Sequence, residues 1–185
     1  MKNALASIAV VILIALVGAT LSAFSGMYDI GADTPHWPVT RTMIEVFRDR
    51  SIAVRTKAID PPNLADEGLV LKGAGQYAAM CVNCHLAPGI SESEIRPGLY
   101  PQPPDLSKHA VDSRAAFWVI KHGIKMTAMP AWGRTHDDAT IWSIVAFVSR
   151  LPHMSPQAYK DIVAKAPPDE DMKSMDRGSM GRSSN

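Results

Sequence analysis

The chain has 185 residues, a formal net charge of +1 and two cysteines. This length fits one domain with extensions, and the near-neutral charge argues against a nucleic-acid partner, which a strongly basic chain would favour. Because both cysteines fall within one short motif, no disulfide is possible if that motif uses them.

The first segment, from Ala4 to Phe24, is apolar and uncharged. As a helix it would be about 31 Å long, enough to cross the hydrocarbon layer of a membrane. Lys2 precedes it and the next basic residue is Arg41, which predicts a cytoplasmic N-terminus and an exported remainder. We therefore expect a transmembrane anchor over residues 1–26. A cleaved signal peptide is the alternative, since two small-x-small sequences lie near the end of the segment.

Residues 27–62 are expected to form a connector. Residues 28–38 are rich in Gly, Asp, Thr and Pro and should be irregular. A basic, amphipathic helix is predicted over residues 40–57. It either lies against anionic headgroups near the anchor or acts as a spacer packed on the next domain, and both interpretations stay open. Pro61-Pro62 marks the boundary.

The next domain is expected at residues 63–156, followed by a polar, disordered tail at 157–185. Gly73 and Gly75 lie within its first helix at a cost of about 1 kcal/mol each relative to Ala, which indicates either a close crossing with another helix or a frayed start of this one. Helices are predicted at residues 67–80, 114–122 and 139–151, with N-caps at Asp66, at Asp112 or Ser113, and at Asp137 or Asp138.

The stretch Cys81-Val82-Asn83-Cys84-His85 carries the chemistry. Two thiols separated by two residues, with a histidine directly after the second, are typical of a c-type haem attachment site. Cys81 and Cys84 would each add to a vinyl group of the porphyrin, and His85 would bind the iron on the proximal side. The alternatives are a redox-active dithiol and a structural zinc site, which would need about four ligands and lacks a second cysteine pair here.

Met129 is the predicted second axial ligand, so that His85 and Met129 hold the iron of one covalently attached haem c. A thioether at this position suits electron transfer, and Pro130 favours an extended loop. Met126 is the rival. A bis-histidine site is the less favoured alternative, because the candidate histidines sit among polar residues where solvent exposure is the ordinary explanation: His109, His122, His136 and His153.

From Gly73 to Leu151 the chain resembles a class I c-type cytochrome domain, of the membrane-anchored, single-haem bacterial subgroup. The resemblance rests on Cys81–His85, Pro103-Pro104-Asp105-Leu106, Phe117–Ile124, Met129-Pro130-Ala131-Trp132 and the helix before and after them. It implies an all-α fold of about three to five helices around the porphyrin, preceded by one transmembrane helix.

The same resemblance implies several contacts. The first and last helices of the domain should cross with Gly73 or Gly75 near Phe147. A proline carbonyl should accept the Nδ1 proton of His85, and four prolines are candidates: Pro97, Pro101, Pro103 and Pro104. Three residues have donors suited to the haem propionates: Arg96, Arg114 and Trp132.

The function expected from these observations is electron transfer between redox proteins at the periplasmic face of the bacterial cytoplasmic membrane. We expect no catalytic residue, no small-molecule substrate and no enzyme activity. Two alternatives remain: a haem-bearing subunit of a larger dehydrogenase or oxidase complex, and a five-coordinate peroxidase or gas sensor, which requires that Met129 does not bind iron. Four basic residues flank the predicted cofactor, and they either form a docking patch for an acidic partner or are simply solvated: Lys108, Lys121, Lys125 and Arg134.

Overall fold

The computed structural model describes residues 2–167, and within this range it is all-helical, as the sequence predicts. The only strand-like feature in the described chain is an isolated bridge between Ala87 and Ile90. The helices are α1 (Lys2–Phe24), α2 (Pro38–Arg55), α3 (Glu67–Met80), α4 (Val82–His85), α5 (Ser113–His122), α6 (Asp138–Arg150) and α7 (Pro156–Lys165), with short 3-10 turns at Arg96–Gly98, Trp132–Arg134 and Leu151–His153.

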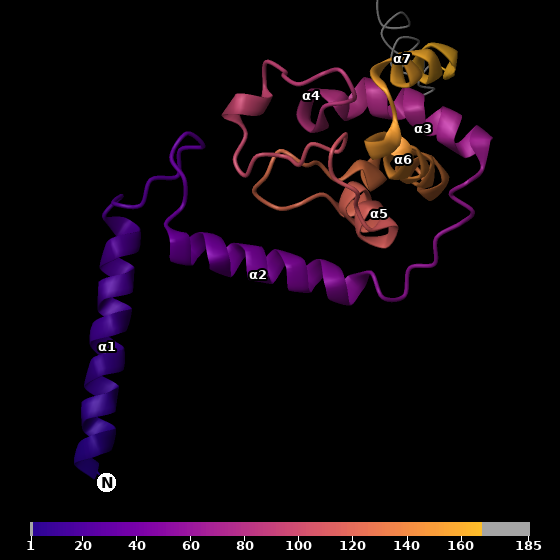
Figure 1. Cartoon of the computed structure of the whole chain (residues 1–185). Helices are drawn as coiled ribbons and strands as arrows, with labels where there is room; N and C mark the ends of the chain where they lie inside the picture. The colour runs from indigo at the N-terminus through magenta and orange to yellow at the C-terminus, as the bar shows by residue number, and fades with distance from the viewer. Residues whose placement is uncertain (1, 168–185) are drawn as a thin grey trace, which may run out of the picture.

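Helix α1 stands apart from the rest of the molecule (Figure 1). It has 23 residues and a mean hydropathy of 2.7, and none of its apolar residues is buried. A core helix of a soluble domain would bury such a surface. The length and composition of α1 therefore suit a helix that crosses a membrane.

The core of the domain is the crossing of α3 and α6, and α6 also contacts α5 (Figure 1). A Cβ atom built on Gly73 would overlap the backbone carbonyl of Ser143 and lie 2.9 Å from the Cβ of Phe147. Gly73 is therefore the glycine at which α3 and α6 cross, next to Phe147 as expected. Gly75 instead faces Pro167, whose carbonyl oxygen would lie 2.7 Å from an added Cβ.

Three aspartates begin the three principal helices of the domain. The side chain of Asp66 accepts a hydrogen bond from Leu69 N at 2.8 Å, that of Asp112 from Ala115 N at 2.9 Å, and that of Asp137 from Thr140 N at 2.7 Å. Each side chain satisfies a backbone donor that the helix itself leaves free. The predicted helix starts are therefore confirmed to within one residue.

Helix α7 corrects the expected tail. Ser155 caps it through a bond from Ala158 N at 3.1 Å, and Tyr159 is buried beside Phe147, with ring centroids 6.3 Å apart. The helix packs on α3 and so belongs to the domain, which extends past residue 156. Residues 168–185, the rest of the expected tail, lie outside the described part of the chain.

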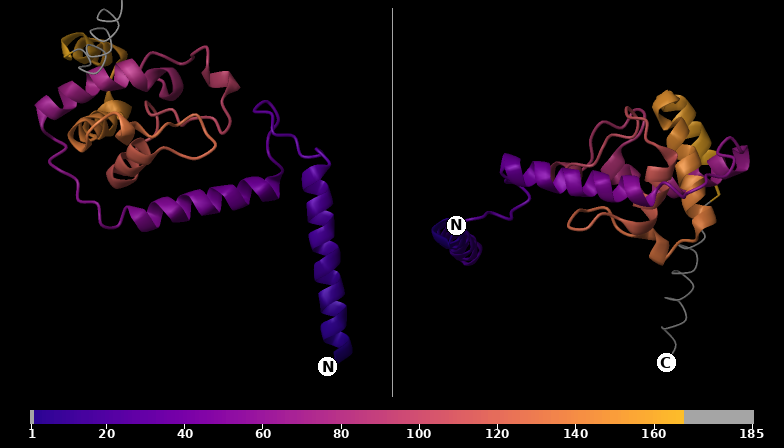
Figure 2. Two further views of the ribbon diagram at one scale, coloured as in Figure 1. Left: turned by 180° about the vertical axis from the view of Figure 1, so that it is seen from behind. Right: turned by 90° about the horizontal axis from the view of Figure 1, so that it is seen from below.

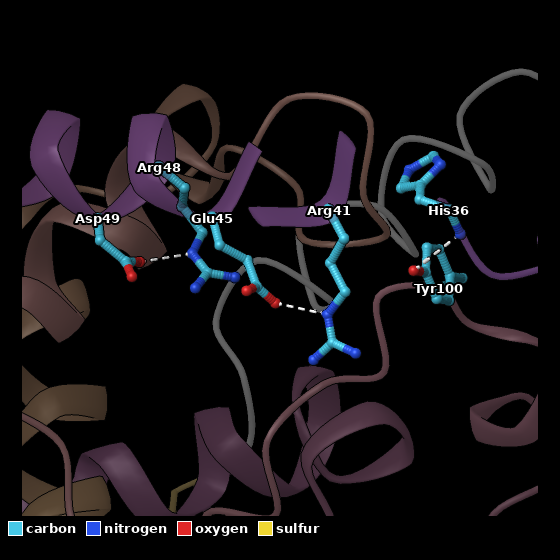
Figure 3. A network of polar contacts seen from close by, with 6 residues as sticks. All are labelled: His36, Arg41, Glu45, Arg48, Asp49 and Tyr100. Atoms are coloured by element: carbon cyan, nitrogen blue, oxygen red, sulfur yellow. Dashed lines mark hydrogen bonds and ion pairs between the residues drawn. The ribbon is translucent and has the colours of Figure 1, made fainter. Parts of the chain in front are cut away.

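The connector lies against the domain through a small aromatic cluster. The backbone N–H of His36 donates to the hydroxyl of Tyr100 at 3.1 Å, and the two rings meet edge-on with centroids 5.1 Å apart (Figure 3). The Tyr28 hydroxyl bonds to Nδ1 of His36 at 2.7 Å. Helix α2 follows, begins at Pro38 rather than at Thr40, and runs beside the domain to reach α5. Proline at the first helical position explains the earlier start.

Candidate functional site

The Cys81–His85 stretch forms one helical turn at the end of α3. Cys84 N and His85 N both donate to Cys81 O, at 3.1 and 2.9 Å. Residues three and four apart in a helix are neighbours on its surface. The turn therefore brings Cys81, Cys84 and His85 to one side, as attachment to a single flat cofactor requires. Leu86 then takes a left-handed φ of 61° and reverses the chain.

The Cys81 thiol does not have the character of a nucleophile in a redox-active dithiol. Burial, together with the neighbouring Cys84 thiol, raises the pKa of Cys81 to about 12. A catalytic dithiol needs a stabilised thiolate and hence a lowered pKa. Zinc is also disfavoured, because within residues 2–167 no group of three or more His, Cys, Asp or Glu side chains is placed to hold a metal ion.

The imidazole of His85 is oriented by the carbonyl oxygen of Pro104, which lies 3.0 Å from Nδ1. With the proton on Nδ1, the lone pair of Nε2 is left for iron. Burial lowers the pKa of His85, the Pro104 bond partly offsets this, and the positive charge of Arg96 lowers the pKa further. The neutral ring, which is the form that binds metals, is therefore favoured. Of the four candidate prolines, Pro104 makes this contact.

The Pro104 segment is itself fixed on both sides. Leu106 N donates to His85 O at 3.0 Å, and Arg96 donates to Pro103 O at 2.8 Å. The carboxylate of Asp105 accepts from Ser107 N at 3.0 Å and pairs with Lys108 Nζ at 2.9 Å. Burial alone would raise the pKa of Asp105, but the bonds from Ser107 and Lys108 lower it below its ordinary value.

A buried tyrosine holds the chain just after the motif. The hydroxyl of Tyr77 donates to Leu86 O at 2.6 Å, and the ring packs against Phe147 with centroids 5.4 Å apart. Burial raises the pKa of Tyr77, so the phenol stays protonated and can donate. This contact was not predicted. Its only sequence signal is a large aromatic residue on the helix that leads to Cys81.

The two candidate methionines differ in environment. Met126 is 99 % exposed, whereas Met129 is partly buried and packs against the hydrophobic core. Thr127 connects the loop: its Oγ1 donates to Ile124 O at 2.9 Å and accepts from Met129 N at 3.1 Å. Ile124 N donates to Met129 O at 3.1 Å. The loop thus closes on itself and holds the Met129 backbone firmly.

One buried donor beside the site lacks a partner. Nε of Arg96 is buried and makes no hydrogen bond within the described residues, although its terminal nitrogen bonds to Pro103 O. A buried cationic N–H without an acceptor is costly. An anionic group such as a haem propionate would satisfy it, so the residues present fit a haem. Arg114, another predicted propionate partner, instead lines a pocket between α2 and α5.

The remaining predicted residues are spread over the surface. His109, His122 and His153 are exposed, and His136 bonds to Thr135 Oγ1 at 2.8 Å. The four basic residues considered for a docking patch differ in whether an acidic side chain already pairs with them. Lys108 pairs with Asp105 and Lys121 with Asp138, at 2.9 and 2.7 Å, while Lys125 and Arg134 are exposed.

Comparison with known families gives one match. The model of the family described as "Cytochrome C oxidase, cbb3-type, subunit III" matches residues 68–148, somewhat under half of the chain. The match runs from the start of α3 into α6 and contains the Cys81–His85 turn, Pro104 and Met129. Comparisons with curated proteins and with solved structures found no match. Residues 68–148 are therefore a c-type cytochrome domain, which implies haem c binding and a role in electron transport.

Proposed function

We propose that this protein is a membrane-anchored electron carrier with one haem c, bonded to Cys81 and Cys84 and with His85 and Met129 as axial ligands. The observation that carries the proposal is the Cys81–His85 turn within a cytochrome domain, with Nδ1 of His85 on the carbonyl of Pro104. When bound, the haem supplies an iron that accepts and releases one electron.

The protein side of the site favours a carrier over a catalyst. His85 is held in one tautomer by Pro104, and Met129 is held by a loop that closes through Thr127 and Ile124. If both side chains bind the iron, no position is left open for a substrate or a gas, and little has to rearrange when the charge of the site changes. These features support an electron carrier with no substrate of its own.

The proposed location is the periplasmic face of the cytoplasmic membrane. Helix α1 begins at Lys2, is uncharged from Ala4 onward, and contains no buried residue. This charge asymmetry supports a cytoplasmic N-terminus and a cytochrome domain on the outer side of the membrane. Retention of α1 as an anchor, rather than its removal as a signal peptide, is part of the proposal. The partners are redox proteins, and the exposed Lys125 and Arg134 are available for docking.

A second candidate is a haem-bearing subunit of a larger oxidase complex, because the matching family is described as an oxidase subunit. Purification in a mild detergent distinguishes a free electron carrier from a subunit of a complex. A carrier elutes alone, whereas a subunit co-purifies with a membrane partner in a fixed ratio.

The experiment that tests the ligands is the near-infrared absorption of the ferric protein, where a sulfur-to-iron charge-transfer band reports thioether ligation. We expect the band in the wild type and in Met126→Ala, and its loss in Met129→Ala. Absence of the band from the wild type would contradict the proposal and favour a bis-histidine or five-coordinate iron.

Attachment is tested separately with Cys84→Ala. This variant can form at most one thioether and should yield little mature holoprotein, measured as haem that stays with the protein under denaturing conditions. A normal, stable haem content in Cys84→Ala would contradict covalent attachment through this motif.

A further inference from the structure

Helix α2 has an exposed apolar face. Val39, Met43, Val46, Phe47 and Val54 recur at helical spacing, so they lie along one side of the helix. Each of these side chains is between 54 and 68 % exposed. A contiguous apolar surface of this kind marks an interaction site.

The side of α2 that faces the cytochrome domain is mixed in polarity, because Asp49, Ile52, Ala53 and Thr56 line a pocket beside α5. Glu45, Arg48 and Ile52 are half-buried there, and Arg48 pairs with Asp49 at 2.7 Å while Glu45 pairs with Arg41 at 2.9 Å (Figure 3). A spacer helix that contributed to the core would turn its apolar side inward. Helix α2 instead leaves most of its large apolar side chains exposed, so its apolar face needs another partner.

The arrangement of the chain indicates what that partner is. Helix α2 begins close to the C-terminal end of α1 and runs crosswise to it, and the cytochrome domain lies on the side of α2 away from the N-terminus of α1 (Figures 1 and 2). If α1 crosses a bilayer, α2 lies along the surface from which α1 emerges. Its apolar face, which points away from the domain, then points toward the lipid.

The charges and aromatic residues around α2 fit a lipid surface. Arg50 lies within the apolar face, is exposed, and forms no ion pair within residues 2–167. Its aliphatic stem can lie along the apolar surface while its guanidinium reaches a lipid phosphate. Trp37, at the start of α2, is 52 % exposed, and Met27 and Ile30 continue the exposed apolar surface back to α1. Tryptophan is enriched at the membrane–water boundary.

We propose that α2 is an in-plane membrane-surface helix, with its apolar face in the boundary between headgroups and acyl chains and Arg50 on phosphate. The occupant of the face is the phospholipid bilayer itself. This inference rests on the proposed retention of α1. It adds that the cytochrome domain sits on the membrane through α2 rather than swinging on a flexible tether, so it is presented to membrane partners at a restricted height and orientation.

The test uses the full-length holoprotein in phospholipid vesicles that contain phosphatidylglycerol, with one added cysteine carrying a nitroxide label. Phe47→Cys reports the apolar face. Asp49→Cys is the matched control, because it lies two residues further along the same helix and on nearly the opposite side. Leu13→Cys reports α1. The readout is the accessibility of each label to oxygen relative to a water-soluble nickel chelate.

We expect a high ratio of oxygen to nickel accessibility at Leu13, as in the hydrocarbon layer. The ratio at Asp49 should be low, as for a label in water, and the ratio at Phe47 should be several-fold above it. Equal, water-like ratios at Phe47 and Asp49, with Leu13 in the hydrocarbon, would overturn the inference and leave the anchor intact. A water-like Leu13 would instead overturn the anchoring. Close label–label distances between Phe47 sites on different molecules at low protein density would assign the face to a second copy and also overturn the inference.

Discussion

At the scale of single residues, both proposed axial ligands depend on backbone carbonyls. The carbonyl of Pro104 fixes the ring of His85, and the carbonyl of Met129 accepts the N–H of Ile124. A side chain leaves the backbone in a direction set by the local φ and ψ angles. A substitution that shifts either segment should therefore displace a ligand without touching it.

Gly123 offers such a test. It has a left-handed φ of 65°, and a Cβ built on it would lie 2.7 Å from Met129 O and 2.7 Å from the carbonyl carbon of Pro130. Gly123→Ala should push the ligand loop outward and weaken or abolish the sulfur-to-iron band while the domain stays folded. The measurement is the near-infrared spectrum together with the far-ultraviolet circular dichroism.

Gly98→Ala is the control for Gly123→Ala. Gly98 has nothing within 4 Å of an added Cβ and no left-handed φ. Its spectrum should match that of the wild type. An unchanged band in Gly123→Ala would show that the loop tolerates the added methyl group, and that this glycine does not position Met129.

The sequence predicts those site residues that lie together in one short motif. It leaves alternatives for the residues that only folding brings to the site. The Cys81–His85 spacing predicts a haem attachment turn from five neighbouring residues. The choice among four prolines depends on how residues 86–112 fold back, a long-range contact that no spacing encodes. The choice of Met129 rests on Pro130, and the exposure of Met126 now adds a physical reason for it.

At the scale of elements, the domain depends on the close approach of α3 and α6 at Gly73. An added methyl group there would overlap the Ser143 carbonyl, which belongs to a helix backbone and cannot move aside easily. Gly73→Ala should destabilise the domain by roughly 1–3 kcal/mol, the usual cost of overpacking. The measurement is the free energy of unfolding from denaturant titration of the holoprotein.

Gly68→Ala is the control in the same helix. An added Cβ at Gly68 meets only the Asp66 side chain, at 3.2 Å. Because alanine favours a helix over glycine by up to about 1 kcal/mol, Gly68→Ala should be neutral or slightly stabilising. A Gly73→Ala variant as stable as Gly68→Ala would contradict the close crossing.

The cap of α6 gives a pH-dependent prediction. A hydrogen bond from Thr140 N, a further bond from its side chain and the charges of Lys72 and His136 lower the pKa of Asp137, although slight burial opposes them. A lowered folded-state pKa contributes stability that is present above the ordinary value of about 4 and is lost as the pH falls through the folded pKa. The cap should therefore weaken in acid.

Two variants distinguish the stability contributed by the cap hydrogen bond of Asp137 from that contributed by its negative charge. Asp137→Ala should lose about 1 kcal/mol at pH 7, whereas Asp137→Asn, an equally good cap, should lose little. Because asparagine does not titrate, the wild type should lose stability relative to Asp137→Asn as the pH falls below about 4. Denaturant unfolding at several pH values measures both effects. A constant difference between the wild type and Asp137→Asn would refute the role of the carboxylate charge.

Local signals explain which elements the sequence predicts. Asp66, Asp112 and Asp137 each stand before an apolar run, so their helices are recognisable. Helix α7 has no long apolar run and precedes a polar segment, so the sequence predicts a tail there, although Ser155 is a cap followed by a proline at the first helical position. Its packing on α3 and the burial of Tyr159 beside Phe147 make it part of the domain.

At the scale of the whole molecule, the connector determines how the anchor and the cytochrome domain are joined. Besides the α2–α5 contact, the connector is held by the backbone N–H of His36 on the Tyr100 hydroxyl, supported by Tyr28. Tyr100 lies in the same loop as Pro104, which orients His85. The segment that leaves the membrane is therefore bonded to the loop that builds the proximal side of the site.

Tyr100→Phe removes only the hydroxyl that accepts the His36 N–H bond. Without it, the connector should open more often, because a local opening is controlled by the bonds that it breaks. We expect faster amide hydrogen exchange in residues 28–37 and unchanged exchange in α3 and α6, measured by mass spectrometry on the full-length holoprotein. Tyr159→Phe, whose hydroxyl makes no hydrogen bond within residues 2–167, should leave the exchange of residues 28–37 unchanged. If Tyr100→Phe also left it unchanged, the aromatic cluster would not be what holds the connector on the domain.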